Sequence, residues 1–159
     1  MSTFAIMPNS PEKNSSVLPK KVLDYIEKSD SISWILLDPN APDSLNNSYA
    51  RIGECLIQVE DTCEERVNAL KSTLIYSKSF EDKGVSKECT FLPDVACVFY
   101  SGNQSLTFAY SFYCDVCRFE YEDTYKEYDG EYVRDAIMQI ALEIFPKDRY
   151  LRKIAGKTR

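Results

Sequence analysis

Histidine is absent from the 159-residue chain, and glycine is scarce. Without histidine there is no Ser-His-Asp or Cys-His nucleophile, no histidine metal ligand and no side chain that ordinarily titrates near pH 7. The five glycines stand singly at positions 53, 84, 102, 130 and 156, so none belongs to a phosphate-cradling loop or a dinucleotide fingerprint. We therefore expect a protein that is not an enzyme and holds no cofactor. Catalysis by carboxylates or lysine is the alternative that these absences leave open.

Long apolar runs are also absent. No stretch approaches the ~20 apolar residues that a membrane span needs, and Met1–Ser16 has neither the charged start nor the apolar run of a secretory signal. We expect no membrane contact and a cytoplasmic location. The length favours one domain. Residues 1–16 are predicted to form a polar N-terminal arm, and residues 17–159 a single domain with a basic C-terminal tail.

The six cysteines stand at positions 55, 63, 89, 97, 114 and 117. In a secreted chain this even number would suggest disulfides. Because no secretory signal is present and several of these cysteines lie in apolar, strand-like runs, we expect free, buried thiols and a reducing compartment.

Charge is distributed unevenly along the chain. The net charge is −6, but residues 147–159 carry +5, so residues 1–146 carry −11. A body this acidic repels nucleic acid and attracts basic proteins, although acidity also serves solubility alone. The basic tail is expected to cap the preceding helix and to dock on the acidic body, with contact to nucleic acid as the alternative.

Strands come in a block between helices, which predicts an α+β fold with an antiparallel sheet packed against two to three helices. The spacing Thr62-Cys-Glu-Glu65 has the form of a capping box, in which the Thr62 hydroxyl accepts from the Glu65 amide. Helices are predicted from Pro19 to about Ser29, from about Cys63 to Ser77 and over Val133–Ile144, with a short helical turn over Tyr150–Ile154. Strands are predicted over Ile32–Leu37, Ile52–Val59 and Val95–Tyr100.

Strict alternation of apolar and polar residues follows from Leu106 to Cys114, and the apolar phase then slips by one residue. A turn or bulge at Asp115-Val116 restores the register. With a tight turn there, Cys114 faces Cys117, and the side chains at 112 and 110 face those at 119 and 121. The sequence therefore predicts a three-stranded meander.

The spacing Cys114-Asp-Val-Cys117 allows three interpretations. Two thiols packing across a hairpin end is the one we favour. A redox pair is a second, but redox motifs of this form open a helix rather than join strands. Half of a zinc site is a third, although no second Cys-x-x-Cys is present. The cysteine pair thus gives an alternative function, a zinc- or thiol-dependent regulatory protein.

Residues 113–132 combine tyrosines with carboxylates and contain only two basic residues. Tyrosine provides large contact area at low entropic cost, and surrounding carboxylates suit a basic partner surface. The alternative is that the tyrosines complete the core and that the acids form a solvated connection from strand to helix. The predicted partner-binding residues are Tyr121, Glu122, Asp123, Tyr125, Glu127, Tyr128 and Asp129.

The segment Ser-Phe-Tyr-Cys114-Asp-Val-Cys117-Arg-Phe-Glu-Tyr121, followed by a helix that closes on Leu142-Glu-Ile-Phe145-Pro146, resembles small bacterial toxin-immunity proteins. These are the immunity proteins of contact-dependent growth inhibition and related polymorphic toxin systems. The resemblance covers roughly the last third of the chain. It implies a cytosolic inhibitor that binds a cognate toxin domain, often a basic nuclease, and blocks its active site. It leaves the oligomeric state open.

Overall fold

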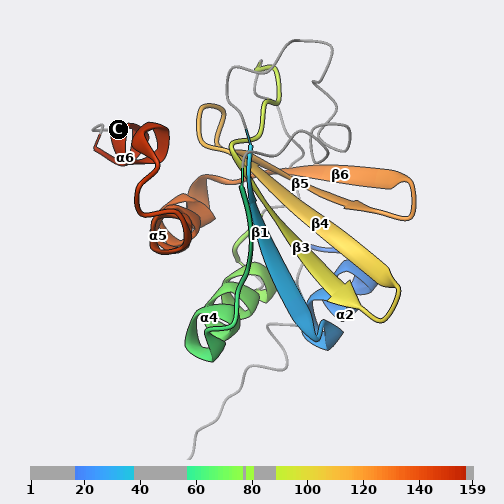
Figure 1. Cartoon of the computed structure of the whole chain (residues 1–159). Helices are drawn as coiled ribbons and strands as arrows, with labels where there is room; N and C mark the ends of the chain where they lie inside the picture. Colours follow the sequence, from blue (N-terminus) through green and yellow to red (C-terminus); the bar gives the residue numbers. More distant parts are fainter. Residues whose placement is uncertain (1–16, 38–56, 77, 81–88, 157–159) are drawn as a thin grey trace, which may run out of the picture.

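A six-stranded antiparallel sheet forms the centre of the protein (Figure 1). The computed structural model describes residues 17–37, 57–76, 78–80 and 89–156. Across the sheet the strands follow the order β2-β1-β3-β4-β5-β6. Their bounds are β1 (Ser31–Leu36), β2 (Ile57–Glu60), β3 (Val95–Ser101), β4 (Gln104–Ser111), β5 (Val116–Tyr121) and β6 (Thr124–Asp129). The expected α+β class with an antiparallel sheet is confirmed.

Helices precede, interrupt and follow the strands. They are α2 (Lys20–Lys28), α4 (Glu64–Ile75), the 3-10 turn η3 (Glu131–Val133), α5 (Arg134–Ile144) and α6 (Arg149–Ala155). Each expected helix is therefore present, including the short one in the basic tail. None of the helices in the described residues is long and apolar enough to cross a membrane. The first 16 residues, and Ile52 and Leu56 of the expected second strand, lie outside the described residues.

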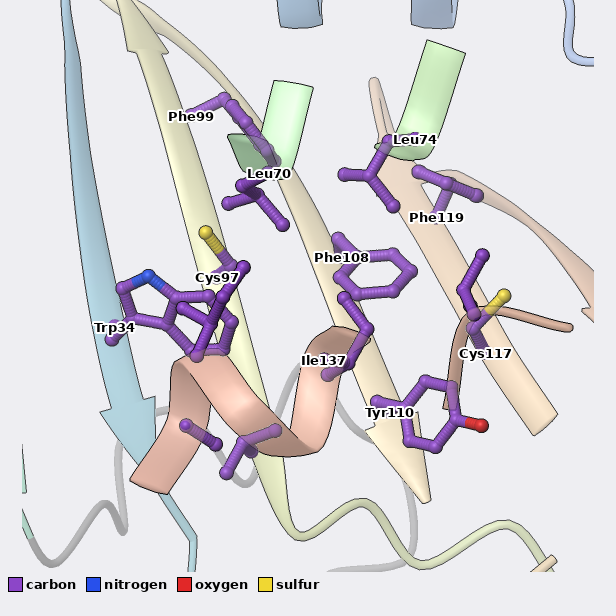
Figure 2. Packing of buried hydrophobic residues seen from close by; sticks show 14 of the residues in the cluster. Trp34, Leu70, Leu74, Cys97, Phe99, Phe108, Tyr110, Cys117, Phe119 and Ile137 are labelled. Carbon is purple, nitrogen blue, oxygen red and sulfur yellow. The ribbon is translucent and has the colours of Figure 1, made fainter. Parts of the chain in front are cut away.

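All of these helices contribute apolar side chains to one face of the sheet, which we call the helix face. Leu70 and Leu74 of α4 and Ile137 of α5 pack there around the Phe108 ring (Figure 2). The strands alternate, so every second residue points to this face. Its buried strand residues are Ile32, Trp34, Leu36, Val95, Cys97, Phe99, Leu106, Phe108, Tyr110, Cys117, Phe119 and Tyr128.

The other face, which we call the opposite face, has a smaller apolar cluster. Phe91 and Cys114, from the segments flanking β3 and β5, pack with it. Its buried strand residues are Ile35, Ala96, Val98, Ala109 and Val116. Side chains on this face are shorter than those on the helix face, and two charged residues of β5, Arg118 and Glu120, also point to it.

The predicted register between β4 and β5 is wrong. Phe108, not Phe112, lies opposite Phe119, and Tyr110 lies opposite Cys117. The chain reverses through the loop 112–115, whose centre lies two residues before the predicted turn at Asp115-Val116, and Asp115 lies in the left-handed region at φ 54°. The longer loop displaces the pairing along β4 while keeping the apolar side chains on the same face.

Buried polar contacts explain why the loop takes this form. Arg134, at the start of α5, donates to the Phe112 carbonyl at 2.7 Å and to the Asp115 carboxylate. The Tyr110 hydroxyl donates to the Gly130 carbonyl at 2.7 Å. A Cβ at Gly130 would lie 2.6 Å from the Tyr110 ring, so only glycine fits there. The loop is thereby fixed to the start of α5.

The predicted meander has three strands, one fewer than the structure shows. β3, β4, β5 and β6 are consecutive in the chain and adjacent in the sheet, so the meander has four strands. β6 lies in the segment interpreted as a connection from strand to helix. Its sequence is mostly polar, and Tyr128 is its only buried residue, so it has no apolar alternation to detect.

The expected capping box at Thr62 is also wrong. Cys63 is the residue that precedes the first turn of α4, and no side chain caps this turn. Asp61, instead of Thr62, provides the side-chain hydrogen bond just before α4. Its carboxylate accepts from the Cys63 amide at 3.0 Å and binds Arg66 through two contacts of 2.9 and 3.0 Å.

The expectation that all cysteines are free thiols is wrong as well. Cys89 and Cys114 form a disulfide, whereas Cys97 and Cys117 are buried free thiols and Cys63 is a partly exposed one. Cys114 belongs to the cluster on the opposite face and Cys117 to the helix face. The two do not pack across a hairpin end. The thiol argument for a reducing compartment therefore no longer holds.

Candidate partner-binding surface

The hairpin formed by β5 and β6, residues 116–129, contains every predicted site residue; we call it the acidic hairpin. It holds five carboxylates and two cations. Its turn places Glu122 and Asp123 in the left-handed region, at φ 50° and 62°. This is the backbone of a two-residue type I′ turn, which normally uses Asn or Gly. The turn therefore escaped detection in the sequence because it lacks both.

Contacts with α2 hold the tip of the hairpin. The Glu122 carboxylate accepts from the Lys21 ammonium at 2.7 Å and from the Tyr25 hydroxyl at 3.1 Å. The hydrogen bond from Lys21 lowers the pKa of Glu122, so this carboxylate stays ionised. Burial, and then the bond to Glu122, raises the pKa of Tyr25. Lys21 and Tyr25 lie about a hundred residues before the hairpin, and no pattern in the sequence links them to it.

Three of the predicted site residues are tyrosines, and they have different environments. Tyr128 is only 8% exposed and packs between Phe80 and Phe119, so it belongs to the core. Tyr121 is partly buried against Tyr25. Tyr125 is 56% exposed on β6. Of the three, only Tyr125 presents most of its ring to a partner.

Tyr125 is held by a cation. The Arg118 guanidinium lies 4.2 Å from the centre of the Tyr125 ring and 4.5 Å from that of Phe91. Its Nε also donates to Glu127 at 2.9 Å. Arg118 faces Glu127 across the strand pair, so one residue orients both a tyrosine and a carboxylate of the predicted site. Such pre-organisation reduces the entropy that these side chains lose on binding.

Glu120 is the unusual residue of this surface. It is 3% exposed, and neither carboxylate oxygen has a hydrogen-bond partner in the described structure. Arg118 forms an ion pair with it at 3.9 Å. Burial raises the pKa of Glu120, and the charge of Arg118 opposes that rise. Sequence reasoning placed Glu120 and Arg118 on one strand face but could not show that they would be buried.

The remaining site residues lie at the two ends of β6. Asp123 is exposed in the turn. The Asp129 carboxylate accepts at 2.9 Å from the amide of Glu131, the first residue of the 3-10 turn that follows. Tyr113 and Tyr132, which lie in the same acidic segment but were not among the predicted site residues, are 86% and 68% exposed. The sequence does not show how exposed each tyrosine ring is, so it could not identify Tyr113 and Tyr132 as the most exposed rings of the segment.

The basic tail lies away from this surface. α6 and the acidic hairpin occupy opposite sides of Figure 1. Leu151 anchors α6 in the core, while Arg149, Arg152 and Lys153 are exposed and make no ion pair with the described residues. The expected docking of these charges on the acidic body is therefore not found in the described part of the chain.

Metal binding by the cysteines has no support from the geometry. Among the described residues, no group of three or more metal-ligating side chains comes together. Cys114 is oxidised in the disulfide, and burial raises the pKa of the Cys117 thiol well above its ordinary value. A thiolate ligand is therefore disfavoured at Cys117.

Comparisons with protein-family models, curated proteins and solved structures gave no match. Function is therefore inferred from the geometry of the acidic hairpin and from the resemblance stated above.

Proposed function

We propose that this protein is an immunity-type inhibitor that binds and neutralises a cognate toxin domain, a basic nuclease, through the acidic hairpin. The observation that carries the proposal is Tyr125. Its ring is mostly exposed, is held on Arg118 and lies beside Glu127. A rigid aromatic anchor surrounded by carboxylates suits a basic protein surface.

The proposal places the inhibitor in the cytoplasm, where a delivered nuclease meets its substrate. The net charge of −11 over residues 1–146 would speed the encounter with a basic domain. It would also repel the nucleic acid that competes for the same domain. Blocking of the toxin active site is part of the proposal, because a carboxylate-rich edge can occupy the groove that receives phosphates.

The first test is co-expression with a toxic C-terminal domain encoded in the adjacent reading frame. The expected result is survival of the cells and co-purification of the two chains. Replacement Tyr125→Ala should weaken binding about 30-fold, the loss typical of a hot-spot anchor. Tyr113→Ala is the matched control, since that ring is more exposed and lies at the far end of β5. Equal affinity of the Tyr125→Ala variant and the wild type would refute the proposed surface.

A second variant separates charge from contact area. Asp123→Asn keeps a residue that tolerates the left-handed turn conformation and removes one exposed charge. We expect a slower association rate that converges on the wild-type rate as salt is raised, with little change in dissociation. Association independent of ionic strength for both proteins would contradict electrostatic steering.

A further inference from the structure

β6 forms one edge of the sheet and carries most of the acidic hairpin's exposed side chains. In Figure 1 it borders the sheet on the side remote from α5 and α6, and no described helix or strand runs along its outer side. An edge strand carries a row of backbone N–H and C=O groups that face away from the sheet. Which residues of β6 supply these groups follows from the pairing with β5.

The pairing has a fixed phase. In an antiparallel pair, hydrogen-bonded and non-hydrogen-bonded residue pairs alternate. The two-residue turn makes Tyr121 and Thr124 a hydrogen-bonded pair. At the other end, the bond of 2.7 Å from the Gly130 amide to the Asp115 carbonyl requires the same phase.

It follows that the backbone groups of Tyr125 and Glu127 point outward, away from β5. These two residues face Glu120 and Arg118 as non-hydrogen-bonded pairs. No hydrogen bond to their N–H or C=O groups is found among the described residues. The outward backbone groups thus belong to the residue that carries the exposed ring and to the residue that carries its neighbouring carboxylate.

We propose that the partner binds by adding an extended, basic segment to β6 as a seventh strand. This deepens the proposed function and depends on it. Main-chain bonds to Tyr125 and Glu127 supply register, as in other cases of strand addition. On the opposite face of the sheet, alternate lysine or arginine side chains of the added strand lie beside Glu127 and stack on the Tyr125 ring.

The charge of β6 favours a basic partner segment, rather than β6 of a second copy of the chain, as the added strand. A second β6 would bring a second Glu127 and Asp129 against the first, with Lys126 as the only cation of each strand. Like charges on paired strands are destabilising, whereas opposite charges stabilise the pair. Charged residues on an edge also suppress pairing between identical strands.

The test uses a synthetic eight-residue peptide of alternating lysine and valine, at concentrations up to 1 mM, and the full-length protein. Amide hydrogen exchange measured by NMR should slow at Tyr125 and Glu127 when the peptide is added. A peptide N-methylated at every lysine lacks the N–H groups that face β6 when its lysines lie on the side of Tyr125 and Glu127, and it should bind at least tenfold more weakly. Because this comparison leaves the protein unaltered, it does not depend on a variant that folds.

Proline provides the matched change in the protein. Glu127→Pro removes one outward N–H and is compatible with an edge strand, whereas Glu127→Ala removes only the side chain. We expect the proline variant to bind the peptide about tenfold more weakly than the alanine variant, corresponding to the loss of one hydrogen bond. Equal affinities of a correctly folded pair would overturn strand addition.

The outcomes separate the two proposals. Salt-dependent binding that leaves both amides unprotected, or that tolerates N-methylation, overturns strand addition but leaves the acidic hairpin as the proposed surface. Absence of peptide binding up to 1 mM overturns strand addition, and the proposed function is then judged by co-purification with the toxin domain. Protection of both amides that rises with protein concentration alone would instead identify a second copy as the occupant.

Discussion

On the helix face of the sheet, Cys117 and Phe119 of β5 are completely buried among apolar side chains, whereas on the opposite face the same strand contributes Arg118 and Glu120. Because side chains alternate along β5, this strand places apolar residues on one face of the sheet and charged residues on the other. The helix face is stabilised by burial of large apolar groups. The opposite face buries a carboxylate without a hydrogen-bond partner, which costs stability. That cost is borne next to Tyr125, where we propose that the partner binds.

The largest expected effect contrasts the same truncation on the two faces. Phe119→Ala should lower the free energy of unfolding by about 3–5 kcal/mol, because the ring is fully buried against Phe80, Phe108 and Tyr128. Phe91→Ala, on the opposite face, should cost clearly less because its ring packs on the Arg118 guanidinium. Urea unfolding followed by circular dichroism measures both. Equal losses would show that the two faces contribute alike.

The next effect concerns the disulfide on the opposite face. Cys89 and Cys114 are 25 residues apart, so replacing both with serine should cost about 3 kcal/mol by loop entropy. A reducing agent should destabilise the wild type by a similar amount and leave the double variant unchanged. Cys63→Ser, which removes a partly exposed free thiol, is the control. The cytoplasm keeps thiols reduced. If the free energy of unfolding of the wild type does not change when reductant is added, the disulfide is not needed for stability in that compartment.

The smallest expected effect is a gain in stability. Burial raises the pKa of Glu120 in the folded protein, so the folded state binds its proton more readily than the unfolded state does. Wild-type stability should therefore fall as pH rises from the ordinary value of 4.5 through the folded pKa. Glu120→Gln lacks this penalty and should be more stable by about 1 kcal/mol at neutral pH, with a Tm about 2–4 °C higher.

The pH profile decides whether this gain has the proposed origin. Thermal unfolding of the Glu120→Gln variant and the wild type should converge below pH 4.5, where both side chains are neutral. Glu64→Gln, an exposed change on α4, should alter stability by less than about 0.5 kcal/mol at any of these pH values. A difference between the Glu120→Gln variant and the wild type that does not depend on pH would attribute the effect to packing instead of charge.

The same contrast explains how much of the fold could be predicted. Apolar periodicity located α2, α4, α5, β1, β3 and β4, since burial on the helix face imposes it. β6 escaped because an edge strand buries little, and its turn escaped because Glu122 and Asp123 adopt a conformation typical of Asn or Gly. The register of β5 depends on the contact between Asp115 and Arg134, which are 19 residues apart in sequence.

The sequence indicated the segment that holds the candidate site but not which of its residues are exposed. The gathering of tyrosines and carboxylates drew attention to the segment 113–132, in which β6 was not predicted, and Tyr125 of that segment has a largely exposed ring. The pattern could not separate Tyr128, which the alternation of β6 turns into the core, from Tyr125, which it turns outward. The sequence shows Arg118 as one of two basic residues in the segment, and its stacking with Phe91 could not be predicted because Phe91 lies outside the hairpin.

The separation of α6 from the acidic hairpin has a consequence for the way in which two molecules meet. The cations of α6 and the excess of carboxylates on the acidic hairpin lie on opposite sides of Figure 1, so these two elements together form an electric dipole. In the field of a positively charged target this dipole experiences a torque that turns the hairpin foremost before any atoms touch. A larger fraction of encounters then has the orientation that leads to binding. This increase disappears when salt screens the charges of α6 and the acidic hairpin.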